Sequence, residues 1–182
     1  MVLFVSSLSF LKLKVLLLSD NHGYWDKGIL KHVEWADEVW HAGDWLNLAL
    51  HNEIFKLGKP IRGVFGNVDG TDVKGWYSLH NRFTIDGLKF WMTHIGGRPG
   101  KYNPKILPML MQNPPDVFIC GHSHMLAVKK DKQLNLMYMN PGACGLHGFH
   151  LVRTAIRFQI IEGQLTNLEI VEWEKKSSNF DL

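Results

Sequence analysis

Short apolar runs that end in polar residues recur through the first half of the chain, and this pattern constrains the fold most. The segment Lys14–Ser19 contains a continuous apolar run before a polar turn, as expected of a strand buried on both faces. Glu38–His41 and Ile61–Phe65 are two further runs of strand length. Between these runs, residues 24–35 and 46–57 carry apolar side chains at helical spacing. The first half therefore predicts a β-α-β-α-β rhythm.

The second half of the chain is rich in strand signals. Asp86-Gly87 separates two β-rich segments, residues 82–86 and 88–93, and this arrangement indicates a hairpin. A helix is expected over residues 104–112, where Pro114-Pro115 ends it. Further strands are expected over residues 116–120, 125–130, 134–139, 152–162 and 168–174. Because each sheet must bury one face on a neighbour, we expect an α/β fold, a four-layer α/β/β/α sandwich of two mixed sheets flanked by helices.

Length and charge exclude several classes of protein. The 182 residues are 46% hydrophobic and 20% charged, so we expect residues 1–182 to form a single globular domain. The net charge of +3 comes from scattered Lys and Arg residues, and this gives no sign of a nucleic-acid or membrane partner. The seven tryptophans suit core packing or a subunit contact, so a homo-oligomer is compatible with the composition.

The cysteines and the chain start bear on location. Cys120 and Cys144 are too few and too far apart for a disulfide framework or a zinc ribbon, which favours a reducing, cytoplasmic setting. Residues 1–12 begin with an apolar stretch that lacks a basic start and a cleavage site, and it is too short to span a bilayer. We interpret residues 1–12 as an extra leader, with an edge strand or a docked tail as alternatives.

Side chains that bind metals follow five of the expected strands. In open α/β sheets, ligand sites gather beyond the carboxyl ends of strands, so these side chains should lie together. Carboxylate, amide and imidazole donors without thiolate suit manganese, iron, zinc or nickel, and an aspartate can bridge two ions. The candidate metal ligands are Asp20, His22, Asp44, Asn67, His94, His122 and His124.

The candidate ligands belong to five short motifs. In chain order these are Asp20-Asn21-His22-Gly23, Gly43-Asp44, Gly66-Asn67-Val68-Asp69, Thr93-His94 and Gly121-His122-Ser123-His124. One motif alone is weak evidence, but the ordered set, from about residue 14 to residue 158, resembles the calcineurin-like metallophosphoesterases. The short length and Asn140-Pro141-Gly142 are similar to the small bacterial and archaeal phosphodiesterases of that superfamily.

The resemblance implies two divalent metal ions, with Mn²⁺ expected and Zn²⁺, Fe²⁺ or Ni²⁺ as alternatives. One ion would be held by Asp20, His22, Asp44 and His124, and the other by Asp44, Asn67, His94 and His122. Two such ions can generate a hydroxide near neutral pH and neutralise charge on the attacking and leaving oxygens. We therefore expect in-line attack on a small phosphodiester substrate, with Asp44, Asn67 and His94 as catalytic residues.

Two positions depart from the pattern of these relatives. Val68 stands where many relatives have a histidine that assists the leaving group. General-acid assistance is worth about 100- to 10,000-fold, so we expect slow turnover of esters with poor leaving groups and better turnover of aryl phosphodiesters or cyclic nucleotides. Ile95 stands where glycine is more common. Behind it, Arg98, Lys101 and Tyr102 could bind a non-bridging phosphate oxygen or a nucleotide, although a solvated loop is the favoured interpretation.

Other polar residues near the motifs have mainly structural interpretations. Asn67 could instead cap the turn after Gly66. Asp69 is expected to support the site, for example by orienting a ligand histidine through a hydrogen bond. Trp45 is the tryptophan placed to line the site. Three nearby histidines could contact substrate or support a ligand, although a partly buried, hydrogen-bonded role is the favoured interpretation: His41, His147 and His150.

Two other functions stay open at this stage. A non-enzymatic scaffold of the same fold is one of them, although the full set of donors argues against it. A nuclease or dinucleotide-polyphosphate hydrolase is the other. It would need a basic or aromatic groove, of which the modest charge gives little sign. A metal-dependent phosphodiesterase is the leading expectation.

Overall fold

A computed structural model describes residues 12–175 of the chain. The expected leader, residues 1–12, lies outside the described residues except for Lys12, which begins the first strand. Within residues 12–175, no helix is both long and apolar enough to cross a membrane.

The first sheet has five strands in the order β12-β11-β1-β2-β3. β1, β2 and β3 are parallel to one another, while β11 is antiparallel to β1 and β12 is antiparallel to β11. The sheet is therefore mixed, as expected. Its strands are β1 (Lys12–Leu18), β2 (Glu38–His41), β3 (Ile61–Gly63), β11 (Val152–Ile161) and β12 (Gln164–Glu174).

The second sheet is also mixed, in the order β4-β5-β8-β10-β9. β5, β8 and β10 are parallel, and the edge strands β4 and β9 are antiparallel to their neighbours. Its strands are β4 (His80–Ile85), β5 (Leu88–Thr93), β8 (Val117–Ile119), β9 (Leu126–Asp131) and β10 (Leu136–Pro141). Residues 96–103 contain a small separate hairpin, β6 (Gly97–Arg98) and β7 (Lys101–Tyr102).

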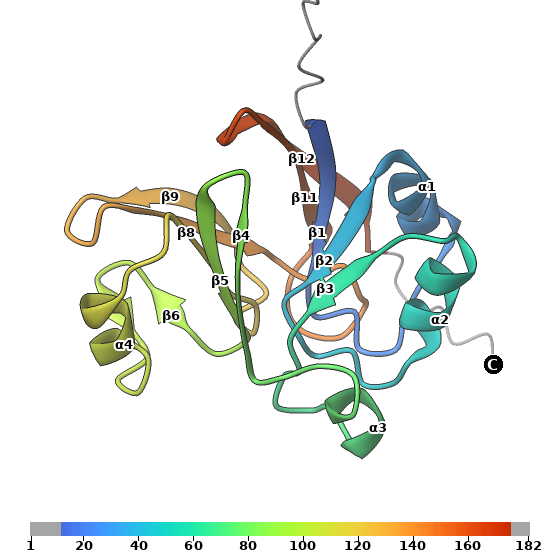
Figure 1. The fold of residues 1–182 in the computed structure, drawn as a ribbon. Helices are drawn as coiled ribbons and strands as arrows, with labels where there is room; N and C mark the ends of the chain where they lie inside the picture. The colour runs from blue at the N-terminus through green and yellow to red at the C-terminus, as the bar shows by residue number, and fades with distance from the viewer. Residues whose placement is uncertain (1–11, 176–182) are drawn as a thin grey trace, which may run out of the picture.

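Helices cover the outer faces of both sheets (Figure 1). The helices are α1 (Lys27–Trp35), α2 (Ala49–Lys56), α3 (Thr71–Lys74) and α4 (Leu107–Gln112). α1 and α2 lie against the first sheet and α4 against the second, so the expected four-layer α/β/β/α arrangement is confirmed. The four-residue helix α3 was not expected from the sequence.

Local capping explains why the first two helices start later than predicted. Asp26 caps α1, because its Oδ1 accepts a hydrogen bond from the Ile29 N–H at 2.9 Å. Before α2, Leu46 adopts a left-handed backbone with φ of 68°, and Asn47 Oδ1 accepts a hydrogen bond from the Ala49 N–H. Both devices satisfy backbone donors that a helix start leaves unpaired.

Successive side chains of β1 point to opposite faces of the first sheet and so pack into two different cores. Val15 and Leu17 point into the core between the two sheets, whereas Leu16 and Leu18 point into the core under α1 and α2. All four side chains are fully buried, and truncating such a leucine to alanine typically costs about 2–5 kcal/mol. This packing holds the carboxyl end of β1, where the first motif begins, in a fixed position.

Candidate metal centre

The topology brings the carboxyl ends of six strands to one edge of the sandwich, at the lower end of both sheets in Figure 1. β1, β2 and β3 end there in the first sheet, and the parallel strands β5, β8 and β10 end there in the second. The predicted ligands all follow strands of this set. Two groups of their side chains lie close enough to hold a metal ion: Asp20, His22 and His124, and Asp44, His94 and His122.

The first group converges on one carboxylate oxygen. Asp20 Oδ1 lies 3.2 Å from His124 Nε2, and the Nε2 atoms of His22 and His124 are 3.3 Å apart. The other oxygen, Asp20 Oδ2, accepts hydrogen bonds from the Ser19 hydroxyl at 2.5 Å and from the His122 N–H at 3.0 Å. These bonds fix the carboxylate, so that Oδ1 points toward the histidines.

The second group is held in an equally defined way. Asp44 Oδ2 lies 3.2 Å from His94 Nε2. His94 Nδ1 donates a hydrogen bond to the Ala42 carbonyl at 2.7 Å, which places the proton on Nδ1 and leaves Nε2 free to bind a cation. The His122 ring packs edge-on against the His94 ring, with centroids 5.2 Å apart.

Asp44 lies between the two groups. Its Oδ2 is 3.2 Å from His94 Nε2 in one group and 3.9 Å from His22 Nε2 in the other. Its Oδ1 accepts a hydrogen bond from the Val68 N–H at 3.1 Å. A carboxylate in this position can bind a cation on each side. Asn67 follows β3 and lines the same cavity of about 540 Å³ as His22 and Asp44.

The donor atoms fit divalent metal ions. Asp20 Oδ1 and His94 Nε2 are buried, and neither has a hydrogen-bond partner among residues 12–175. Buried polar atoms without partners are costly, and a bound cation would satisfy both. The donors are oxygen and imidazole nitrogen, and no thiolate takes part. Cys120 and Cys144 are buried free thiols, and burial raises the pKa of Cys144 to about 12.

The charges in the site favour ionised aspartate. Burial raises the pKa of Asp44, but the adjacent His94 outweighs this effect and holds the pKa below its usual value. Conversely, burial lowers the pKa of His94, yet Asp44 and Asp20 together raise it above its usual value. His94 therefore carries a proton in the metal-free protein over a wider pH range than an ordinary histidine, and a metal ion must displace that proton.

The backbone of the site is unusual. Asp20, His22, Asp44, His122 and His124 all have positive φ, from 46° to 67°, a region that non-glycine residues seldom adopt. Each such residue turns the chain sharply, so that its side chain points into the site directly after a strand. A Cβ at Gly66 would lie 2.0 Å from Asp44 Oδ1, so glycine is required there for the two motif loops to touch.

Two supporting residues differ from expectation. Asp69 does not contact a ligand histidine. Instead its Oδ2 accepts hydrogen bonds from the N–H groups of Asp44 (3.1 Å) and Gly66 (2.7 Å), and its Oδ1 from that of Leu46 (2.7 Å). It thus joins the second and third motif loops through their backbones.

Trp45 was predicted to line the site, and this is wrong. Its ring is fully buried and stacks on Tyr77, because the turn at Asp44 sends consecutive side chains in opposite directions.

Three further histidines surround the donors. His41 is fully buried, stacks on Trp45 at 3.6 Å and accepts a hydrogen bond from the Gly43 N–H, so it supports the second motif loop. The rings of His147 and His150 pack against those of His22 and His124, with centroids 4.8 and 5.4 Å apart. Both were expected to be partly buried and hydrogen-bonded, which holds for His150, whose Nε2 donates a hydrogen bond to the Gly145 carbonyl, but is wrong for His147, which is exposed. A position beside the donors could have been expected from the sequence, because both histidines follow Asn140-Pro141-Gly142 at the end of a sixth strand, β10.

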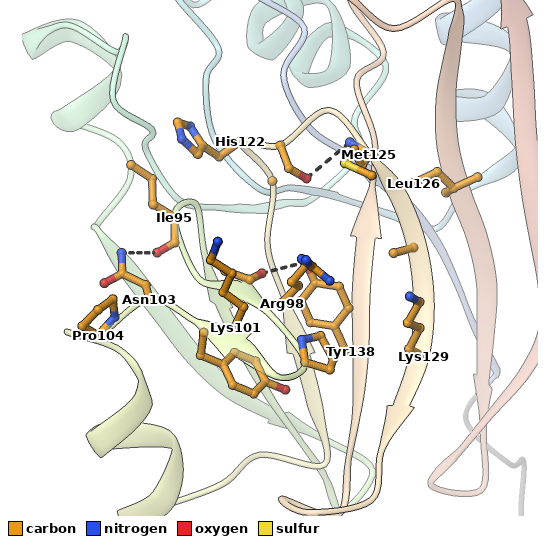
Figure 2. Close-up of a pocket in the computed structure, with 16 residues that line it drawn as sticks. Ile95, Arg98, Lys101, Asn103, Pro104, His122, Met125, Leu126, Lys129 and Tyr138 are labelled. Atoms are coloured by element: carbon orange, nitrogen blue, oxygen red, sulfur yellow. Dashed lines mark hydrogen bonds between the residues drawn. The ribbon is translucent and has the colours of Figure 1, made fainter.

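The predicted substrate residues lie in a second, larger cavity of about 690 Å³ (Figure 2). It shares His122, Ser123 and Met125 with the cavity that Asp44 and Asn67 line, so the two cavities adjoin. Arg98 and Tyr102 both line it. The Tyr102 hydroxyl is already committed, since it donates a hydrogen bond to Asp131 at 2.7 Å, so this residue offers its ring to the cavity.

Comparison with known proteins places the chain in a family. The model of the calcineurin-like phosphoesterase superfamily domain matches residues 13–163. A phosphodiesterase of Methanocaldococcus jannaschii is 29% identical over 149 residues, which cover 72% of this chain and 84% of that protein.

Solved structures show the same fold. A Streptococcus pneumoniae protein described as a predicted phosphoesterase is 18% identical, with 91% of each chain covered and a TM-score of 0.64. Vps29 of Entamoeba histolytica, complexed with Zn²⁺, is 17% identical, with 88% of this chain and 99% of that one covered and a TM-score of 0.63. The family model spans all five motifs, the whole second sheet and the first sheet apart from Lys12 and β12, and the chain therefore belongs to the calcineurin-like phosphoesterase superfamily.

Proposed function

We propose that the chain is a metal-dependent phosphodiesterase that binds two divalent ions, with Mn²⁺ preferred, and acts on a small phosphodiester. The observation that carries this proposal is the position of Asp44 Oδ2 between His94 Nε2 and His22 Nε2, at 3.2 and 3.9 Å. These nitrogens belong to separate donor groups, so one carboxylate serves both.

Divalent ions in such a site supply a nucleophile from water near neutral pH and positive charge for the phosphate oxygens. Asp20, His22, Asp44 and His124 would hold one ion, and Asp44, Asn67, His94 and His122 the other. The protein fixes these donors before substrate arrives. The Ala42 carbonyl orients His94, and the His122 N–H orients Asp20.

Val68 favours substrates with good leaving groups. Its side chain lines the cavity of the donors beside Asn67 and has 39% of its surface exposed, so an apolar group occupies this place. A valine cannot give a proton to a departing oxygen. Esters whose leaving group needs a proton should turn over slowly, whereas the aryl oxide of an aryl ester leaves readily without one.

We also propose a single domain over residues 1–182 and a cytoplasmic location. The core between the sheets joins β1 at the start of the described residues with β11 near their end, and this supports one folding unit. Cys120 and Cys144 are both free thiols, and this supports a reducing compartment.

The main rival is a protein-interaction scaffold. The structural likeness to Vps29, one example of which was solved with a cyclic peptide at a TM-score of 0.57, is the observation that favours it. A scaffold has no need for buried donor atoms without partners, such as Asp20 Oδ1 and His94 Nε2. The site therefore favours the enzyme.

The test is hydrolysis of bis(4-nitrophenyl) phosphate by metal-stripped protein reloaded with Mn²⁺, Zn²⁺ or Ni²⁺. We expect turnover with at least one metal and faster turnover of this diester than of 4-nitrophenyl phosphate. His94→Gln should remove activity, while His32→Gln on α1, outside both donor groups, should retain it. No turnover with any of these metals would favour the scaffold.

A further inference from the structure

The cavity beside the donors is much larger than a phosphate group needs. Its volume of about 690 Å³ lies within the range of about 300–1,000 Å³ that is typical of sites for organic ligands. His122, a predicted metal ligand, lies at one end of it (Figure 2). A phosphodiester held at the donors would therefore extend one of its two arms into this cavity.

The cavity carries positive charge. Arg98 and Lys101 on the β6–β7 hairpin and Lys129 on β9 line it, and no aspartate or glutamate is among its described lining residues. Asp131 lies behind the wall, where it accepts hydrogen bonds from the Tyr102 hydroxyl and from the backbone N–H groups of Gln133 and Leu134. These hydrogen bonds occupy the Asp131 carboxylate. The side chains of Arg98, Lys101 and Lys129 therefore face the cavity without a carboxylate partner there.

Hydrogen bonds fix the walls of the cavity in place. The Tyr138 hydroxyl donates a hydrogen bond to the Gly97 carbonyl at 2.9 Å, and the Asn103 side-chain amide donates one to the Ile95 carbonyl at 3.0 Å. These bonds anchor the hairpin to the second sheet. Tyr138 is only 2% exposed and so offers little ring surface, whereas the partly exposed Tyr102 commits its hydroxyl to Asp131 and presents its ring to the cavity, which suits a flat ring system.

We propose that this cavity binds one arm of the substrate, and that the arm bears a ring, has the size of a nucleotide and carries at least one negative charge besides that of the diester. The inference rests on the proposed phosphodiesterase function. It assigns Arg98, Lys101 and Lys129 as residues that determine specificity by binding the additional anionic group.

Two matched chromogenic diesters test the charge. Thymidine 5′-(4-nitrophenyl phosphate) and its 3′-phosphorylated form differ in a single phosphate. Hydrogen bonds to charged groups are worth a factor of about ten or more in binding, so we expect the Mn²⁺-loaded protein to prefer the phosphorylated form by about tenfold in kcat/KM. Arg98→Met and Lys129→Met should each reduce this preference. Lys130→Met is the matched control, because Lys130 neighbours Lys129 on β9 but does not line the cavity, and it should retain the preference.

A binding experiment separates this inference from the proposed function. Calorimetric titration of metal-stripped protein with thymidine 3′,5′-bisphosphate and thymidine 5′-monophosphate requires no turnover. We expect tighter binding of the bisphosphate, with the difference lost in Arg98→Met and kept in Lys130→Met. Hydrolysis of both diesters at equal kcat/KM, with equal binding of both nucleotides, would overturn the cavity inference and leave the phosphodiesterase function standing. Absence of hydrolysis together with a preference for the bisphosphate would instead overturn the function alone.

Discussion

Asp69 gives the sharpest test of how the metal-binding loops are held. Asp69 is 3% exposed and accepts three backbone hydrogen bonds, from Asp44, Leu46 and Gly66. In Asp69→Asn, the amide NH₂ can replace only one carboxylate oxygen. The least costly orientation leaves the partly buried Leu46 N–H without an acceptor. Loss of one hydrogen bond to a charged group costs about 1.5–3 kcal/mol, so the free energy of unfolding should fall by that amount.

The same substitution should also weaken metal binding. Changes to residues that orient metal ligands typically reduce metal affinity about 10- to 100-fold, and Asp69 orients the loop of Asp44. Urea unfolding of metal-stripped protein measures the first effect and Mn²⁺ titration the second. Asp72→Asn, an exposed position in the first turn of α3, removes the same charge nearby and should cost less than about 1 kcal/mol. If Asp69→Asn matched Asp72→Asn in both measurements, the proposed support of the site would be refuted.

Three further predictions concern the site. Gly66→Ala should remove activity and destabilise the protein in urea unfolding, because the new Cβ would lie 2.0 Å from Asp44 Oδ1. Gly75→Ala is the control. Its new Cβ would have no neighbour closer than 3.4 Å, so the free energy of unfolding should change by less than about 1 kcal/mol. Val68→His should raise kcat/KM for esters with poor leaving groups, including phosphomonoesters, because the histidine can protonate the leaving oxygen. No gain would show that the shape of the cavity, and not the missing acid, limits the turnover of these esters. Because the pKa of His94 is raised above 6.5, Mn²⁺ affinity should fall as the pH drops toward and below 6.5. In metal-stripped protein, the pairing of His94 with Asp44 contributes stability at low pH, and this contribution is lost as the pH rises through the raised pKa of His94. A titration of Mn²⁺ affinity that is flat from pH 6 to 8 would contradict this sign.

The longer strands were predicted well from the sequence, because the apolar runs and turn residues that indicate a strand lie within or beside it. The apolar run of β1 and the Asp86-Gly87 turn between β4 and β5 depend on residues that are adjacent in sequence. The edge of the sandwich that holds the donors could also be expected, since parallel strands end together. Helix starts were less accurate, because the cap formed by Asp26 and the turn formed at Leu46 and Asn47 compete with apolar spacing.

Side-chain direction and tertiary neighbours could not be predicted in the same way. Trp45 follows Asp44 directly, yet the positive φ at Asp44 sends the tryptophan into the core. His147 and His150 reach the site only because β10 pairs in parallel with β8 and so ends at the same edge. That pairing depends on contacts far apart in the sequence, which local periodicity does not record.

Metal content measured together with activity tests the two-metal account most directly. Metal-stripped protein is saturated with Mn²⁺, freed of excess metal by gel filtration and assayed for bound Mn²⁺ and for hydrolysis of bis(4-nitrophenyl) phosphate. We expect two ions for each wild-type chain. We expect one ion or none, with no turnover, for Asp44→Asn, because that variant loses the charge and one oxygen of the carboxylate between the donor groups. Two ions and undiminished turnover in Asp44→Asn would contradict the two-metal account.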